Sequence, residues 1–271
     1  MQRTVFFVSD GTGITTETLG HSLLTQFPGV GFKQERVPFV DSPEKAVEVV
    51  NQINGACADD GAAAIVFISI MDDKTRAVFY RSEGVTLDLF ADFMDTLEQA
   101  FGVARESTVG QAHGVANTER YEDRIEATNY TLTHDDGMSL SYESAELVLL
   151  GVSRSGKTPT CLYMALHFGV KAANYPLTQE DLENQRLPPS LRQHKRKIVG
   201  LMIDADRLAQ IRENRRAGSR YASLRQCHWE VDAAESLLRA EGIDVIYTTH
   251  SSIEEIASRI LVQLGLQREM F

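Results

Sequence analysis

The chain has 271 residues, of which 43% are hydrophobic and 24% charged, which is the composition of a globular protein with room for one large domain or two ordinary ones. Its net charge of −11, from 27 basic and 38 acidic residues, argues against general binding to nucleic acid or to an anionic membrane. No apolar run approaches the roughly 20 residues of a membrane span. The three widely spaced cysteines suggest neither a disulfide framework nor a zinc site, so we expect a cytoplasmic protein.

The first part of the chain alternates strand and helix signals. Short apolar runs predict strands at 4–9, 36–40 and 63–70, and periodic apolar residues predict helices at 14–27, 46–57 and 90–101. The run at 63–70 is almost continuously apolar, as in a strand that is buried on both faces of a parallel sheet. This βαβαβ order predicts a parallel α/β domain. The apolar face of the helix at 90–101 is a candidate surface for a homodimer.

The alternation resumes after a polar segment. A helix is predicted at 121–133, and Gly137 can end it in the left-handed conformation. Residues 137–144 are polar and turn-like, so we expect an N-terminal α/β domain of 1–140 and a second α/β domain of 141–271. Strands are predicted in the second domain at 146–150, 170–174, 198–203 and 244–247, with helices between them at 208–216 and 228–240. Ser252 and Glu255 form a capping box that starts a final helix.

One contiguous motif stands out: Gly151-Val152-Ser153-Arg154-Ser155-Gly156-Lys157-Thr158 fits the pattern G-x-x-x-x-G-K-T at every fixed position. A predicted strand precedes it and an apolar helical stripe follows it, which is the context that the motif requires. Glycines let backbone N–H groups converge on an anion, and the helix N-terminus adds partial positive charge. Lys157 would reach the terminal phosphates and the Thr158 hydroxyl would bind Mg²⁺. An ordinary turn of small residues is the alternative, but the complete pattern favours a P-loop, kinase-like nucleotide-binding domain.

Two other groups of residues could take part in the chemistry. Asp204 ends a predicted strand in the same domain, where a carboxylate can orient Mg²⁺ or accept the proton of an attacking hydroxyl, although it could equally cap the following helix. Arg212, Arg215 and Arg216 lie within one and a half helical turns. Because arginine binds phosphate bidentately, they could clamp a phosphoryl group or a phosphorylated partner, and a solvated basic face is the alternative.

Five motifs resemble those of one family. Residues 5–15 (VFFVSDGTGIT), 124–127 (RIEA), 134–137 (HDDG), 151–159 (GVSRSGKTP) and 252–255 (SIEE) occur in the order found in the phosphoenolpyruvate synthase regulatory proteins, relatives of the pyruvate phosphate dikinase regulatory proteins. Together they cover nearly the whole chain.

The resemblance implies a bifunctional enzyme. Members of this family phosphorylate a threonine of the synthase or dikinase with ADP as donor, once the target's neighbouring histidine is phosphorylated. They also remove that phosphate with inorganic phosphate as acceptor and pyrophosphate as product. The phosphate motif by itself would instead suggest ATP or GTP.

On this chain, the resemblance places the nucleotide at residues 151–158. Lys157 would then neutralise the β-phosphate of ADP, and Mg²⁺ would bind Thr158. Asp204 as the base and the arginine cluster as a clamp are our own inferences from the residues. Two alternatives stay open: a small-molecule kinase with the same phosphate motif, and a non-catalytic ADP sensor that binds a partner.

Overall fold

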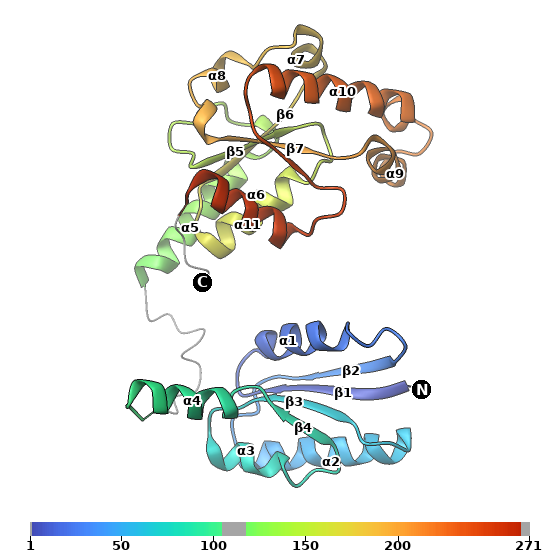
Figure 1. The fold of residues 1–271 in the computed structure, drawn as a ribbon, viewed down its shortest axis with the longest axis vertical. Helices are drawn as coiled ribbons and strands as arrows, with labels where there is room; N and C mark the ends of the chain where they lie inside the picture. The colour runs from blue at the N-terminus through green and yellow to red at the C-terminus, as the bar shows by residue number, and fades with distance from the viewer. Residues whose placement is uncertain (1, 105–117, 267–271) are drawn as a thin grey trace. The chain divides into compact units, whose positions relative to one another are not determined.

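The computed structural model describes residues 2–104 and 118–266, and the chain divides into two compact α/β units, 1–116 and 117–271 (Figure 1). The sequence placed the boundary near residue 140. The structure puts the division earlier, because the helix α5 (Thr118–Thr133) packs against α6 (Lys157–Phe168) of the second unit. The hydroxyl of Thr131 also donates to the carbonyl of Ala172 in that unit, at 2.8 Å.

The first unit is built on a four-stranded parallel sheet in the order β2-β1-β3-β4. Its strands are β1 (Gln2–Ser9), β2 (Gly31–Val37), β3 (Ile65–Ser69) and β4 (Val85–Asp88). Its helices are α1 (Ile14–Leu24), α2 (Pro43–Asp60), α3 (Asp73–Phe79) and α4 (Ala91–Phe101). The expected parallel α/β architecture of this part is therefore confirmed.

Two apolar layers hold the first unit together, one on each face of the sheet (Figure 1). The α1 layer includes Phe7 and Phe67, whose stacked rings lie 5.6 Å apart. Gly20 lets α1 approach closely, since a Cβ there would lie 2.5 Å from the Phe7 ring. The other face packs under α2 and α3.

The second unit has a parallel sheet of the same strand pattern, β6-β5-β7-β8. The strands are β5 (Leu147–Gly151), β6 (Ala172–Pro176), β7 (Ile198–Met202) and β8 (Val245–Tyr247). In both units the first strand lies inside the sheet, with the second strand on one side of it and the third and fourth on the other. The carboxyl end of β5 is thus a topological switch point, where ligands of open α/β sheets bind.

Helices cover both faces of the second sheet (Figure 1). One face carries α6 and α11 (Ile253–Leu264), with α5 packed on α6. The other carries α7 (Gln179–Asn184), α8 (Pro189–Arg192), α9 (Ala205–Arg215) and α10 (Leu224–Ala240). Short 3-10 turns lie at η2 (Asp135–Gly137), η3 (Lys195–Lys197) and η4 (Arg220–Ala222). The capping box expected at Ser252 and Glu255 is present.

Several predicted elements differ from the observed ones. The second strand was predicted at 36–40 but occupies Gly31–Val37, while α3 and β4 were not predicted at all. Both β2 and β4 are edge strands with no buried residue, so they lack the apolar runs by which buried strands are recognised. Gly137 has the predicted left-handed conformation, at φ 72°, but it is the last residue of the η2 turn and does not end α5 directly.

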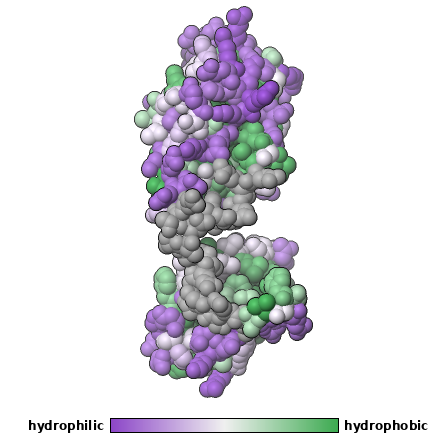
Figure 2. Space-filling view, turned by 90° about the vertical axis from the view of Figure 1, so that its left-hand side faces the viewer, coloured by the Kyte–Doolittle hydropathy of each residue, from purple (hydrophilic) through white to green (hydrophobic). Residues whose placement is uncertain are grey.

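The visible surface of the second unit is mainly hydrophilic, whereas that of the first unit carries broader hydrophobic areas (Figure 2). Phe93, Leu97 and Phe101 are exposed on α4 of the first unit. The apolar face predicted for this helix therefore exists, and its role in a homodimer stays a prediction. Within residues 2–104 and 118–266, none of the helices combines the length and the apolarity needed to cross a bilayer.

Candidate functional site

The predicted phosphate loop, residues 151–158, connects the buried strand β5 to α6, which is the context that the motif requires. Its first glycine is needed for space: a Cβ on Gly151 would lie 2.4 Å from the carbonyl oxygen of Leu201 in β7. Its bends use left-handed backbone, with φ 78° at Arg154 and 95° at Gly156. Gly156 caps α6 without a side-chain hydrogen bond, so the first N–H groups of the helix point towards the loop. This geometry suits an anion.

A buried hydroxyl also fits an anion inside the loop. Ser155 is 1% exposed, and among the described residues its Oγ has no hydrogen-bond partner. An unpaired buried hydroxyl costs free energy unless a ligand satisfies it. A phosphate oxygen would supply the missing acceptor.

Lys157 is the cation of the loop, and it is almost completely buried at 4% exposure. Its Nζ donates to the carbonyl oxygen of Val152 at 2.9 Å. Burial lowers the pKa of Lys157 from 10.5 to about 8, although the nearby carboxylates of Asp136 and Asp135 oppose that shift. Lys157 therefore stays within reach of deprotonation in mildly alkaline solution, and a bound phosphate would favour its charged form.

Thr158 contacts a carboxylate that lies outside the phosphate motif. Its hydroxyl donates to Oδ1 of Asp135 at 2.7 Å, and the Asn174 side-chain amide donates to the same oxygen. Asn174 is completely buried on β6, and its Oδ1 accepts from the backbone N–H of Asp136 at 3.1 Å. The strand residue Asn174 thus fixes the η2 turn so that two carboxylates lie beside the end of the phosphate loop.

These side chains fit a magnesium site that a nucleotide would complete. Among the residues that the structure describes, no cluster of three or more His, Cys, Asp or Glu side chains could hold a metal by itself. Mg²⁺ does not require three such side chains, because it binds one or two carboxylates together with phosphate oxygens and waters. Thr158 and Asp135 supply a hydroxyl and a carboxylate side by side.

The three arginines predicted as one clamp do not share a face. Arg215 and Arg216 are exposed at the end of α9, whereas Arg212 is completely buried. The Arg212 guanidinium pairs with Glu230 at 2.6 Å and donates to the carbonyl oxygen of Ser153 at 3.0 Å. It also lies over the Tyr221 ring, 4.0 Å from its centroid. Arg212 therefore supports the phosphate loop, and a phosphate-binding role for the three arginines stays a prediction.

The environment of Arg212 keeps it charged. Burial by itself would lower the pKa of Arg212, but the hydrogen bond and the negative charge of Glu230 raise it. Charged partners of this kind are missed when only the spacing of basic residues is read, because burial is not visible in a charge run.

Asp204 lies where the sequence placed it, just beyond the carboxyl end of β7, next to β5 in the sheet. It occupies the N-cap position of α9, but its exposed side chain makes no capping hydrogen bond. Its backbone N–H donates to the Thr249 hydroxyl at 2.9 Å. Since the carboxylate is not used as a cap, Asp204 stays a candidate for chemistry.

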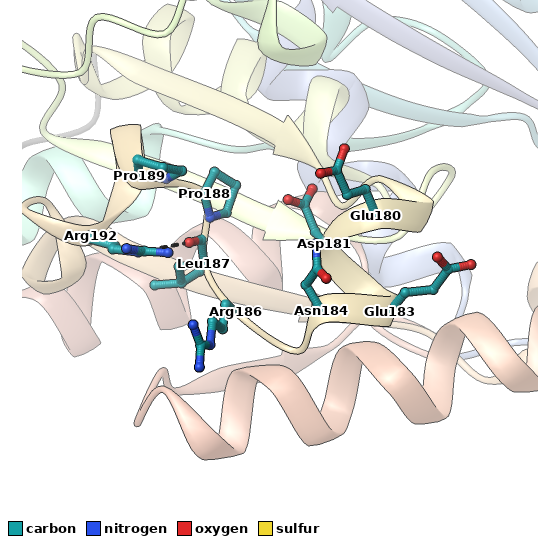
Figure 3. A pocket seen from close by; sticks show the side chains of 9 residues that line it. All are labelled: Glu180, Asp181, Glu183, Asn184, Arg186, Leu187, Pro188, Pro189 and Arg192. Carbon is teal, nitrogen blue, oxygen red and sulfur yellow. Dashed lines mark hydrogen bonds between the residues drawn. The ribbon is translucent and has the colours of Figure 1, made fainter.

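A polar cavity of about 630 Å³ lies around α7 and the start of α8 (Figure 3). Glu180, Asp181 and Glu183 line one part of it, and Arg186 and Arg192 another. Arg192 is held in place by donating to the Leu187 carbonyl oxygen at 3.0 Å. Three carboxylates make this cavity a poor site for the phosphates of a nucleotide.

Comparisons with known proteins agree on one family. The profile of the family described as kinase/pyrophosphorylase matches residues 5–261. A protein of Stenotrophomonas maltophilia (strain R551-3) is 53% identical over 269 residues, covering 99% of this chain and 98% of its own. Proteins of Pseudomonas aeruginosa (strain LESB58) and Xanthomonas oryzae pv. oryzae (strain MAFF 311018) are 51% and 50% identical with the same coverage. All three carry the name "Putative phosphoenolpyruvate synthase regulatory protein".

Proposed function

Because this chain belongs to the kinase/pyrophosphorylase family, we propose that it regulates phosphoenolpyruvate synthase by reversible phosphorylation of a threonine. In one direction it acts as a kinase with ADP as the phosphoryl donor and inactivates the synthase. In the other it acts as a pyrophosphorylase, with inorganic phosphate as acceptor, and restores the synthase. The proposal includes a cytoplasmic location, and pyruvate phosphate dikinase is the alternative target.

The observation that carries this proposal is the hydrogen bond of Thr158 to Asp135 at the phosphate loop, next to the buried Lys157. The N-terminus of α6 brings together the buried amine of Lys157, the Ser155 hydroxyl and the Thr158 hydroxyl, which is bound to Asp135. The Ser155 hydroxyl has no hydrogen-bond partner among the described residues. Phosphoryl transfer requires little beyond such positioning and charge stabilisation. The site therefore suits the transfer of a terminal phosphoryl group in either direction.

In the kinase direction, the target hydroxyl oxygen forms a bond to the β-phosphorus of ADP, and the bond from that phosphorus to the bridging oxygen breaks. AMP leaves, and the hydroxyl proton passes to a base, for which we propose Asp204. Lys157 stabilises the charge that develops on the β-phosphoryl oxygens. When bound, Mg²⁺ would be held by Thr158 and Asp135 and would neutralise phosphate charge.

In the reverse direction, an oxygen of inorganic phosphate attacks the phosphothreonine phosphorus. The bond from that phosphorus to the threonine oxygen breaks, pyrophosphate forms, and the threonine oxygen regains a proton. In both directions a phosphoryl group is transferred at the phosphate loop, to or from the same threonine. One phosphate loop can thus serve both reactions.

The reverse reaction gives a direct test. Synthase that has been inactivated with this protein and ADP should regain activity when ADP is removed and phosphate is added, with one pyrophosphate released per threonine restored. Lys157→Ala should lose both directions. Release of inorganic phosphate without pyrophosphate would identify an ordinary phosphatase and would contradict the proposal.

A further inference from the structure

A second cavity, which we call the Trp229 cavity, has a volume of about 670 Å³ and lies between α7, η4 and the start of α10. Its lining combines an indole, two amides and two guanidinium groups, from Trp229, Gln179, Gln226, Arg220 and Arg225. The size is within the usual range of small-molecule sites. An aromatic face with polar groups around it suits a flat heterocycle.

The walls of the Trp229 cavity are tied to the start of the phosphate loop. Tyr221, the neighbour of Arg220 in η4, shares a hydrogen bond with the Ser153 hydroxyl, with the two oxygens 3.0 Å apart. On α10, Gln226 donates to Glu230 at 3.1 Å, and Glu230 binds Arg212. Since Arg212 donates to the Ser153 carbonyl oxygen, both walls reach the same loop residue.

Charge distinguishes the two ends of the loop. The carboxylate of Asp135 binds Thr158 at one end, whereas an arginine and a tyrosine bind Ser153 at the other. A nucleotide whose terminal phosphates lie in the loop therefore meets less electrostatic repulsion if the rest of it extends past Ser153. The cavity of Figure 3 shares Glu183 with the Trp229 cavity but adds two more carboxylates, and it has no aromatic side chain.

We propose that the Trp229 cavity binds the nucleoside of the nucleotide whose phosphates occupy the loop, with the base against the Trp229 indole. This inference rests on the proposed nucleotide function and adds a base-binding site to it. Trp229 is 38% exposed, so part of it is accessible to a ligand. Stacking of a base on an aromatic side chain contributes about 1–3 kcal/mol.

The chain contains a single tryptophan, so fluorescence excited selectively at tryptophan reports on this cavity alone. ADP should change the emission of Trp229 saturably, while pyrophosphate, which has phosphates but no nucleoside, should compete for the loop and change the emission far less. An equal response to both ligands, or none to ADP that calorimetry shows to be bound, would overturn the base-binding site.

Affinity gives an independent readout that does not depend on catalysis. Trp229→Leu should weaken ADP binding by about 5- to 150-fold, which corresponds to the loss of one stacked base, and leave pyrophosphate binding unchanged. Trp229→Phe should recover much of the loss. Val262→Ala, an exposed apolar residue on α11, is the matched control and should bind both ligands normally.

The outcomes separate this inference from the proposed function. If ADP and pyrophosphate bind and Trp229→Leu keeps its ADP affinity, the base-binding site is wrong and the nucleotide function stands. If neither ligand binds to the unaltered protein, both proposals fail together.

Discussion

Thr158 and Asp135, which are 23 residues apart in the chain, are joined by a hydrogen bond of 2.7 Å from hydroxyl to carboxylate. The buried amide of Asn174 donates to the same carboxylate oxygen, so the pair is fixed by the strand β6. The bond places a negative charge beside the hydroxyl that a P-loop offers to Mg²⁺. The phosphate loop and the η2 turn are therefore in direct contact.

Asp135→Asn should separate metal binding from phosphate binding. The amide oxygen can still accept from Thr158, but the negative charge is lost. We expect the increase in ADP affinity caused by Mg²⁺ to fall by about 10- to 100-fold, with metal-free ADP binding preserved or stronger. Calorimetric titration of ADP with and without Mg²⁺ measures this. An unchanged effect of Mg²⁺ would exclude Asp135 from the metal site.

Asp204→Asn should instead impair the chemical step and leave metal binding intact. If Asp204 is the base, its loss lowers phosphoryl transfer by about 10²- to 10⁴-fold and leaves ADP binding and its Mg²⁺ dependence intact. Single-turnover transfer to the synthase measures the chemical step. Transfer at the normal rate would reject Asp204 as the base and leave Asp135 as the carboxylate to test next.

ADP affinity should depend on pH through Lys157, whose pKa is lowered to about 8. Below that pH the amine is already charged. Above it, binding must take up a proton, so the dissociation constant should rise by up to tenfold per pH unit. Calorimetry between pH 7 and 9.5 measures this rise. Arginine stays charged in this range, so Lys157→Arg should abolish the pH dependence, and a flat profile in the unaltered protein would contradict the assignment.

Arg212→Met should destabilise the second unit by about 3 kcal/mol or more, because it leaves Glu230 and the Ser153 carbonyl without their buried partner. The midpoint of urea unfolding, followed by circular dichroism, measures the change. Arg239→Gln is a suitable control on α10, since its side chain is 80% exposed and its removal should change stability by less than about 0.5 kcal/mol. Equal effects of the two changes would show that Arg212 is not a structural support.

Gly151→Ala should damage the loop, because the added Cβ would lie 2.4 Å from the backbone oxygen of Leu201. We expect lower stability and loss of pyrophosphate binding. Gly55→Ala is the control: a Cβ at that position on α2 meets nothing within 4 Å, so the change should be neutral or stabilising by up to about 1 kcal/mol. Thermal unfolding and pyrophosphate titration distinguish the two positions.

The contiguous parts of this protein could be predicted from its sequence, and the parts assembled from distant segments could not. The loop from Gly151 to Thr158 and the buried strand β5 are continuous patterns. The contact of Asp135 with Thr158 depends instead on how β6 positions Asn174, although the HDDG motif at 134–137 marked that turn as a family feature. Sequence alone gave no reason to join it to the loop.

The burial of individual side chains could not be predicted from the sequence either. Arg212 shares a charge run with Arg215 and Arg216, and only the packing of α9 against α10 shows that its guanidinium is enclosed. The edge strands β2 and β4 were missed or displaced for the converse reason, since their exposed side chains interrupt the apolar pattern.

The proposed phosphoryl transfer runs from ADP to a threonine of the synthase. It is tested most directly with two labelled donors, ADP labelled on its β-phosphate and ATP labelled on its γ-phosphate, and with synthase already phosphorylated on its histidine. We expect label on a threonine from ADP, none from ATP, and none with Lys157→Ala. Label from ATP alone would contradict the donor, and no label from either, with ADP still bound, would indicate a sensor that transfers nothing.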